Sequence, residues 1–216
     1  VRLMETKDYL RAGEWERALE TSAEMADIAW RLNELHGTGL MQRGLIALWT
    51  GDTDEIDAVL SSITADLKGC AFTPGHLETL VRHGVLFRDP AIKACLEQGA
   101  RYVHNEFPWS RPLALARLAT AVAAFLGGDI DRLNEQLAEI SAHEFREYPG
   151  DLLAPLYISV GEAGRAREIL TRTYEASRND RPLCAWLDCL LGEAYSAESP
   201  AKDLGQAEQH FELSEK

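Results

Sequence analysis

The chain contains 216 residues, of which 46% are hydrophobic, enough to bury the core of one large domain or of a continuous array of repeats. Its formal net charge of −13 at pH 7 argues against direct binding to nucleic acid or to an anionic membrane surface. No apolar run reaches the roughly 18 residues of a transmembrane helix, and the charged N-terminal segment is unlike a secretory signal, so we predict a cytoplasmic protein.

Helical segments of two kinds alternate along the chain. The segments 37–51, 74–88 and 109–127 are rich in apolar residues, nearly all round in the first and third, whereas 15–32 and 130–140 are amphipathic. A helix that is apolar on every side must be covered by several neighbours, and an amphipathic helix covers one face. The alternation therefore predicts an all-α fold of stacked helical hairpins, and no strand pattern interrupts it.

Short breaks separate the helical segments at a regular distance. The residues expected to pack just after successive breaks are Ala18, Ile56, Cys95, Leu133, Ala166 and Ala207. Their spacings are 38, 39, 38, 33 and 41 residues, which indicates one repeated unit across the whole chain. Acidic residues follow the breaks in "GDTDEID" and "GGDID", where we expect them to cap helix N-termini.

The last repeat carries the most specific pattern. Leu191-Gly192-x-x-Tyr195 precedes Ala207-x-x-x-Phe211, and this resembles a tetratricopeptide repeat, in which a small residue lets two helices approach and aromatic rings fill the gap. A second copy contains Ala154, Tyr157, Gly161, Ala166 and Leu170, whereas the copy around 84–102 is degenerate. The resemblance implies a superhelical array, an α-solenoid, of about six antiparallel hairpins.

These divergent repeats are also similar to the helical sensor arrays of bacterial signal-transduction ATPases, including large ATP-binding LuxR-type and maltose-activator-type regulators. That resemblance implies a role in transcription regulation or signal transduction through ligand or partner binding. We accordingly interpret residues 1–216 as a single tetratricopeptide-like domain within a longer chain, with other domains of the same polypeptide among its partners.

No motif for catalysis or for a cofactor is evident. The sequence "GTGLMQRG" lacks the Lys and Ser or Thr of a phosphate loop, and the scattered histidines lack the spacing of a metal site. The sequence shows no nucleophile elbow and no Cys/His pattern. The prediction is a non-catalytic protein without a cofactor, and an all-helical enzyme is the weakest alternative.

The expected inner helices carry an unusual charge for so acidic a chain. They contain Arg43, Arg82, Arg88, Arg111 and Arg117, and their only acidic residue is Glu78. Helical projection selects Gln42, Trp49, Arg82, Arg117 and Thr120 as the candidate lining of a concave groove that would bind a protein, a peptide or a small anionic effector. The alternative is that these arginines form ion pairs with acidic residues of neighbouring outer helices. Two functions stay open: the sensor or scaffold of a regulator, and a free-standing peptide-binding adaptor.

Overall fold

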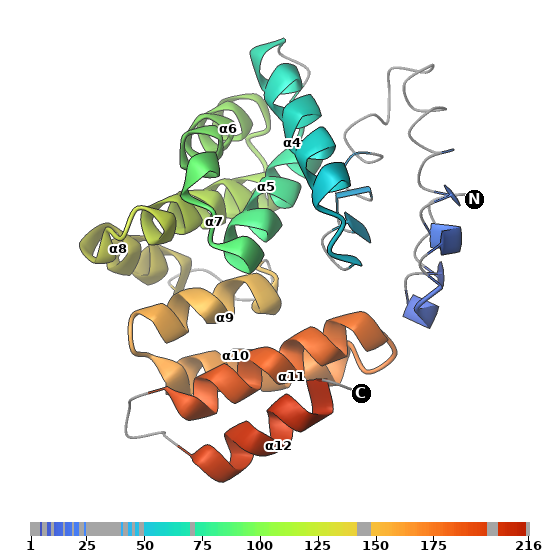
Figure 1. The fold of residues 1–216 in the computed structure, drawn as a ribbon. Helices are drawn as coiled ribbons and strands as arrows, with labels where there is room; N and C mark the ends of the chain where they lie inside the picture. The colour runs from blue at the N-terminus through green and yellow to red at the C-terminus, as the bar shows by residue number, and fades with distance from the viewer. Residues whose placement is uncertain are drawn as a thin grey trace.

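The computed structural model describes residues 51–69, 72–141, 148–197 and 203–214 without a gap, together with separate residues between 5 and 50. Over these residues the chain is helical and contains no strand, which confirms the predicted all-α class (Figure 1). The helices are α4 (Thr53–Lys68), α5 (Pro74–Phe87), α6 (Lys93–Glu106), α7 (Ser110–Leu126), α8 (Ile130–Ser141), α9 (Gly150–Ser159), α10 (Ala163–Ala176), α11 (Arg181–Ser196) and α12 (Leu204–Ser214), with a short 3-10 helix η1 (Pro90–Ile92) before α6.

Consecutive helices pack in pairs. Helix α5 contacts α6, α7 contacts α8, α9 contacts α10, and α11 contacts α12. The first helix of each pair also contacts the first helix of the next pair, from α5 through α7 and α9 to α11, and the succession can be followed in Figure 1. One hydrophobic core accordingly includes buried residues from Leu40 to Ala194.

The enclosed position of α7 accounts for its nearly continuous apolar sequence. It packs against α5, α6, α8 and α9, and its buried residues run from Pro112 to Ala124 on almost every side of the helix. Many of them are alanines, whose small side chains allow neighbouring helices to approach closely. Among the described residues, no helix combines the length and apolarity needed to cross a membrane.

Glycines in the left-handed region make several of the predicted breaks. Gly13, Gly51, Gly128 and Gly161 have φ between +67° and +82°, a conformation that costs glycine little because it has no Cβ. Arg88 takes the equivalent position at the end of α5 with φ +50°. Because this break is formed by arginine and not by glycine, the repeat around 84–102 lacks the sequence signal of the other breaks.

Two of the helices that follow these breaks, α4 and α8, begin with the expected N-terminal cap. Asp52 accepts a hydrogen bond from the Glu55 amide at 3.0 Å, and Asp129 accepts one from the Arg132 amide at 3.1 Å. These contacts satisfy amide groups that have no partner within the helix. The capping predicted for "GDTDEID" and "GGDID" is therefore confirmed.

The expected packing positions are buried in five of six repeats. Ala18, Ile56, Leu133, Ala166 and Ala207 are all buried, but Cys95 is only half-buried and Leu96 is buried in its place. Cys95 still packs against the core, and the fully buried position moves by one residue to Leu96 because η1 lies between the break and α6.

The close contact expected at Gly192 is confirmed. A Cβ atom placed on Gly192 of α11 would lie 2.5 Å from the Cε1 atom of Phe211 on α12, closer than real Cβ contacts. Ala154 of α9 and Ala207 of α12 are also buried. The last two helices thus approach through a small residue and an aromatic ring, as the 191–211 pattern predicts.

Candidate functional site

Two of the predicted site residues share a pocket. Arg117 and Thr120 of α7 line a pocket of about 630 Å³ together with residues of α6 and α8. We call it the basic pocket and define it by Glu97, Ala100, Arg101, His104 and Asn105 of α6, Ala116, Arg117 and Thr120 of α7, and Arg132 and Gln136 of α8. Gln42 and Trp49, the two predicted groove residues of the first inner helix, lie outside the described residues.

Helical spacing brings these side chains together. The α6 residues lie at i, i+3, i+4, i+7 and i+8, which places them along one face of that helix. Arg132 and Gln136 are one turn apart on α8, and Arg117 and Thr120 are three residues apart on α7. The pocket is therefore lined by three helices that follow one another in the sequence.

The basic pocket has a net positive charge within an acidic chain. It contains three guanidinium groups and one carboxylate, a net charge of +2, while the chain carries −13. Arg132 Nη1 lies 3.2 Å from Glu97 Oε1 and so neutralises that carboxylate. Among the residues that the structure describes, Arg101 and Arg117 have neither an ion pair nor a hydrogen bond from their side chains.

Neutral polar groups complete the lining. The Thr120 hydroxyl donates to the Ala116 carbonyl at 3.0 Å, which leaves its oxygen able to accept a hydrogen bond. The amides of Asn105 and Gln136 add donors and acceptors, and His104 adds an imidazole. The pocket can thus offer forked cationic donors together with neutral groups of both kinds.

Arg82 lies elsewhere, in a buried ion-pair cluster. Its Nη1 donates to Asp151 Oδ2 of α9 at 2.9 Å, and its Nη2 donates to Glu78 Oε1 of the same helix at 3.2 Å. Burial opposes the charged guanidinium, but the two carboxylates outweigh this effect and raise the pKa of Arg82 above its ordinary value. Arg82 therefore ties α5 to α9, and the structure does not bring it into the basic pocket.

The sequence left two interpretations open for the inner-helix arginines, a groove lining or ion pairs with neighbouring helices. The remaining three arginines do not all follow the same one. Arg43 pairs with Glu55 of α4 at 2.6 Å, which is the pairing with an outer helix that the alternative predicts. Arg88 lies 3.5 Å from Glu193 of α11 and 6.0 Å from the ring centre of Phe125. Within the described residues, Arg111, like Arg117, has no ion pair. Three of the five arginines are paired, but only Arg43 pairs with an outer helix, because Asp151 and Glu193 lie on α9 and α11, the first helices of their pairs.

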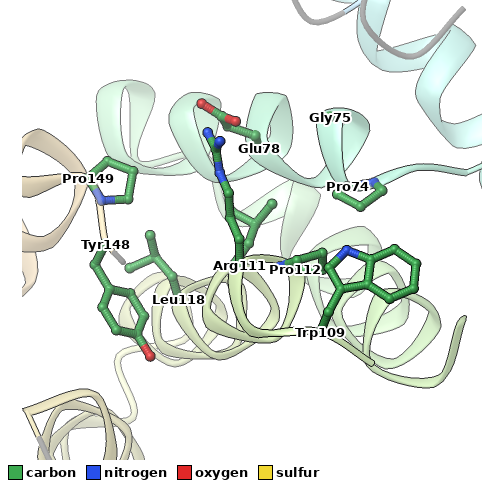
Figure 2. Close-up of a pocket in the computed structure, with 10 residues that line it drawn as sticks. Pro74, Gly75, Glu78, Trp109, Arg111, Pro112, Leu118, Tyr148 and Pro149 are labelled. Carbon is green, nitrogen blue, oxygen red and sulfur yellow. The ribbon is translucent and has the colours of Figure 1, made fainter. Parts of the chain in front are cut away.

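A second hollow lies on the other side of α7 (Figure 2). This cleft, of about 800 Å³, is defined by Pro74, Gly75 and Glu78 of α5, Trp109 before α7, Arg111, Pro112, Leu115 and Leu118 of α7, and Tyr148 and Pro149 before α9. We call it the helix-start cleft, because α5, α7 and α9 all begin there. Its lining is mainly apolar, in contrast to the basic pocket.

Sequence reasoning missed the contributions of α6 and α8. The sequence-based prediction considered only side chains of the inner helices, whereas Arg101 and His104 lie on α6 and Arg132 lies on α8. The polar face of 101–105 was a usable signal, because Arg101, His104 and Asn105 stand at helical spacing with no acidic residue between them. In the described part of the chain, no three His, Cys, Asp or Glu residues gather as a metal site would require.

No protein-family model matches this chain, and neither a curated protein nor a solved structure matches it. The resemblance to tetratricopeptide repeats therefore stays a prediction from the sequence.

Proposed function

We propose that this chain is a non-catalytic, tetratricopeptide-like superhelical array that serves as the sensor or scaffold of a larger cytoplasmic bacterial regulator. The pairing of consecutive helices, and the contacts between successive first helices, support the array. The contact between Gly192 and Phe211 supports the repeat register. The regulatory setting rests on the sequence resemblance alone.

We further propose that the basic pocket binds a small anionic effector, such as a phosphorylated metabolite. The observation that carries this proposal is the pair Arg101 and Arg117, two guanidinium groups that lack an acidic partner among the described residues of a strongly acidic chain. Guanidinium groups present parallel donors that match phosphate and carboxylate oxygens. The negative charge of the rest of the chain disfavours binding of a long polyanion, because only the field near the basic pocket attracts anions.

Titration of the intact chain with a panel of phosphorylated sugars, nucleotides and dicarboxylates, followed by amide NMR shifts, tests the pocket. We expect at least one compound to shift amides around 97–105 and 116–120 and not elsewhere. Arg117→Gln should weaken that binding by about 1.5–3 kcal/mol, the value typical of a hydrogen bond to a charged group. Arg172→Gln, which removes an exposed cation on α10, is the matched control.

Two results would contradict the assignment. The first is a panel in which no compound shifts these amides. The second is binding that Arg117→Gln and Arg172→Gln reduce equally, because that would indicate a general charge effect. The regulatory setting has its own test in the full-length gene, where a nucleotide-binding or DNA-binding module beside this segment would support it.

A further inference from the structure

The basic pocket carries its polar groups in a row along α6. Glu97, Arg101 and Asn105 lie at i, i+4 and i+8, which spaces them by about 6 Å along the helix axis. The ion pair between Glu97 and Arg132, at 3.2 Å, occupies one end of this row, and the amide of Asn105 occupies the other. Arg101, in the middle, is exposed and has no acidic partner among the described residues. The row thus places an available cation between polar groups on both sides.

Two guanidinium groups of the pocket are available to one divalent anion. Arg132 neutralises Glu97, the one carboxylate among the described lining residues, and this leaves Arg101 and Arg117. Helix α7 contains no acidic residue, and the other acidic residues of α6 and α8 lie outside the lining: Glu106, Asp131, Glu135 and Glu139. A phosphate monoester carries a charge of about −1.5 to −2 at pH 7, which two guanidinium groups balance, whereas a monocarboxylate carries a single charge.

The rest of the lining offers little apolar surface. Its apolar residues are Ala100 and Ala116, both buried, and the imidazole of His104 is the single ring among the described lining residues. Most small-molecule pockets are lined mainly by apolar and aromatic side chains, and nucleobases bind by stacking on aromatic rings. A nucleobase or an aromatic acid would therefore gain little from this pocket beyond the contacts of its charged group.

Neutral hydrogen-bonding groups take the place of an apolar lining. The Thr120 hydroxyl donates its proton to the Ala116 carbonyl at 3.0 Å, so its oxygen accepts a further hydrogen bond. The amides of Asn105 and Gln136 each donate and accept, as a ligand hydroxyl group also does. An apolar body would cover these groups without giving them partners, and a covered polar group without a partner costs binding free energy. The lining therefore favours a body that carries hydroxyl groups.

Resting on the anion-binding function proposed for the basic pocket, we propose that its ligand is a phosphate monoester with a hydroxyl-rich body, the chemical class of the sugar phosphates. The phosphate lies between Arg101 and Arg117, whose forked donors match its oxygens. The hydroxyl groups of the body bind Thr120, Asn105 and Gln136. The pocket discriminates against nucleotides and against phosphates of apolar chains, because neither satisfies these neutral groups.

The test is isothermal titration calorimetry of the intact chain with probes that share a phosphate and differ in the body attached to it. The probes are a hexose monophosphate, hexyl phosphate, adenosine monophosphate and inorganic phosphate. Hexyl phosphate has as many carbon atoms as the hexose but no hydroxyl group, so the pair isolates the contribution of the hydroxyl groups. The hexose without its phosphate is the fifth ligand and isolates the contribution of the charge.

The expected order of affinities follows from the lining. Each hydrogen bond between neutral groups contributes about twofold to tenfold in affinity, so the hexose monophosphate should bind at least about tenfold more tightly than hexyl phosphate. Adenosine monophosphate and inorganic phosphate should bind with affinities close to that of hexyl phosphate. The hexose alone should show no measurable binding, because it does not engage Arg101 and Arg117.

Two variants separate the two parts of the pocket. Gln136→Leu keeps the approximate size of the side chain and removes its amide, so it should weaken the hexose monophosphate by about threefold to tenfold and leave hexyl phosphate unchanged. Arg117→Gln should weaken all the phosphate probes by a similar factor. Asn134→Leu, which removes an exposed amide of α8 outside the pocket, is the matched control and should change neither. Circular dichroism of each variant establishes that it is folded.

The outcomes distinguish the ligand class from anion binding itself. Hexyl phosphate, adenosine monophosphate or inorganic phosphate binding as tightly as the hexose monophosphate would overturn the ligand class and leave anion binding in place. Equal effects of Gln136→Leu and Asn134→Leu on the hexose monophosphate would do the same. Absence of binding by every phosphate probe, or equal losses with Arg117→Gln and Arg172→Gln, would instead contradict the anion-binding function, and the ligand class would fall with it.

Discussion

Substitution of Gly192 provides the most direct test of the repeat register. Carbon atoms pack at about 3.5–4.0 Å, and a Cβ atom at this position would lie 2.5 Å from Cε1 of Phe211, so the ring must withdraw by about 1 Å. Overpacking of this kind costs about 1–3 kcal/mol, and exchanging glycine for alanine within a helix returns about 0.5–1 kcal/mol. We therefore expect Gly192→Ala to cost about 0–2.5 kcal/mol and Gly192→Leu to cost at least about 1–3 kcal/mol.

The magnitude for alanine depends on how far the ring can move. Phe211 is 37% exposed, so it can turn partly toward solvent, which favours the lower half of the range for Gly192→Ala. The larger side chain of Gly192→Leu fills the same gap completely, and α12 itself must then shift. Because α12 packs chiefly against α11, the loss should be concentrated in these two helices.

Urea unfolding followed by far-UV circular dichroism measures the overall loss, and amide hydrogen exchange locates it. Gly164→Ala on α10 is the matched control, because its new Cβ would meet only Arg167 Nη2 at 3.9 Å. The double variant Gly192→Ala/Phe211→Ala should no longer show the cost of the methyl group. Equal stability of Gly192→Ala and Gly164→Ala, or an unchanged cost when Phe211 is removed, would refute the register.

The other predictions use the same unfolding assay. Arg82→Leu leaves Asp151 buried without its cation and should cost about 3–5 kcal/mol, whereas a near-zero effect would show that the pair is dispensable. Arg88→Gly should be more stable than Arg88→Ala by about 1 kcal/mol, because both lose the same contacts and only alanine keeps the left-handed strain; equal stabilities would contradict this. Burial raises the pKa of Tyr157 above the ordinary value of 10.0, so the folded chain holds this proton longer than the unfolded chain does. The associated stability is fully present below about pH 10 and is lost as the pH rises through the raised pKa, and Tyr157→Phe should lessen the decline; an unaltered decline in that variant would assign it to other groups.

Several features of the fold could be predicted because they depend on neighbours within one or two helical turns. Helical spacing decides which face of a segment is buried, and a glycine with positive φ ends a helix at the residue where it stands. The fully buried position falls on Leu96 and not on Cys95, because "RDPAI" forms an additional 3-10 turn before α6.

The amino-acid sequence by itself determined that the chain is helical, where its helices break, and that arginines are concentrated on helices that are otherwise apolar. Only the tertiary structure decided which of those arginines are available. Arg82 is neutralised by Asp151, 69 residues away, while Arg117 faces Arg101 and Arg132 from the two helices beside it. The reason is that an ion pair requires two groups within about 4 Å, and the distance between side chains of different helices is set by how the hairpins pack. Two arginines with the same local sequence pattern thus have different roles. Arg82 joins two helices through an ion pair, whereas Arg117 is a candidate binding group.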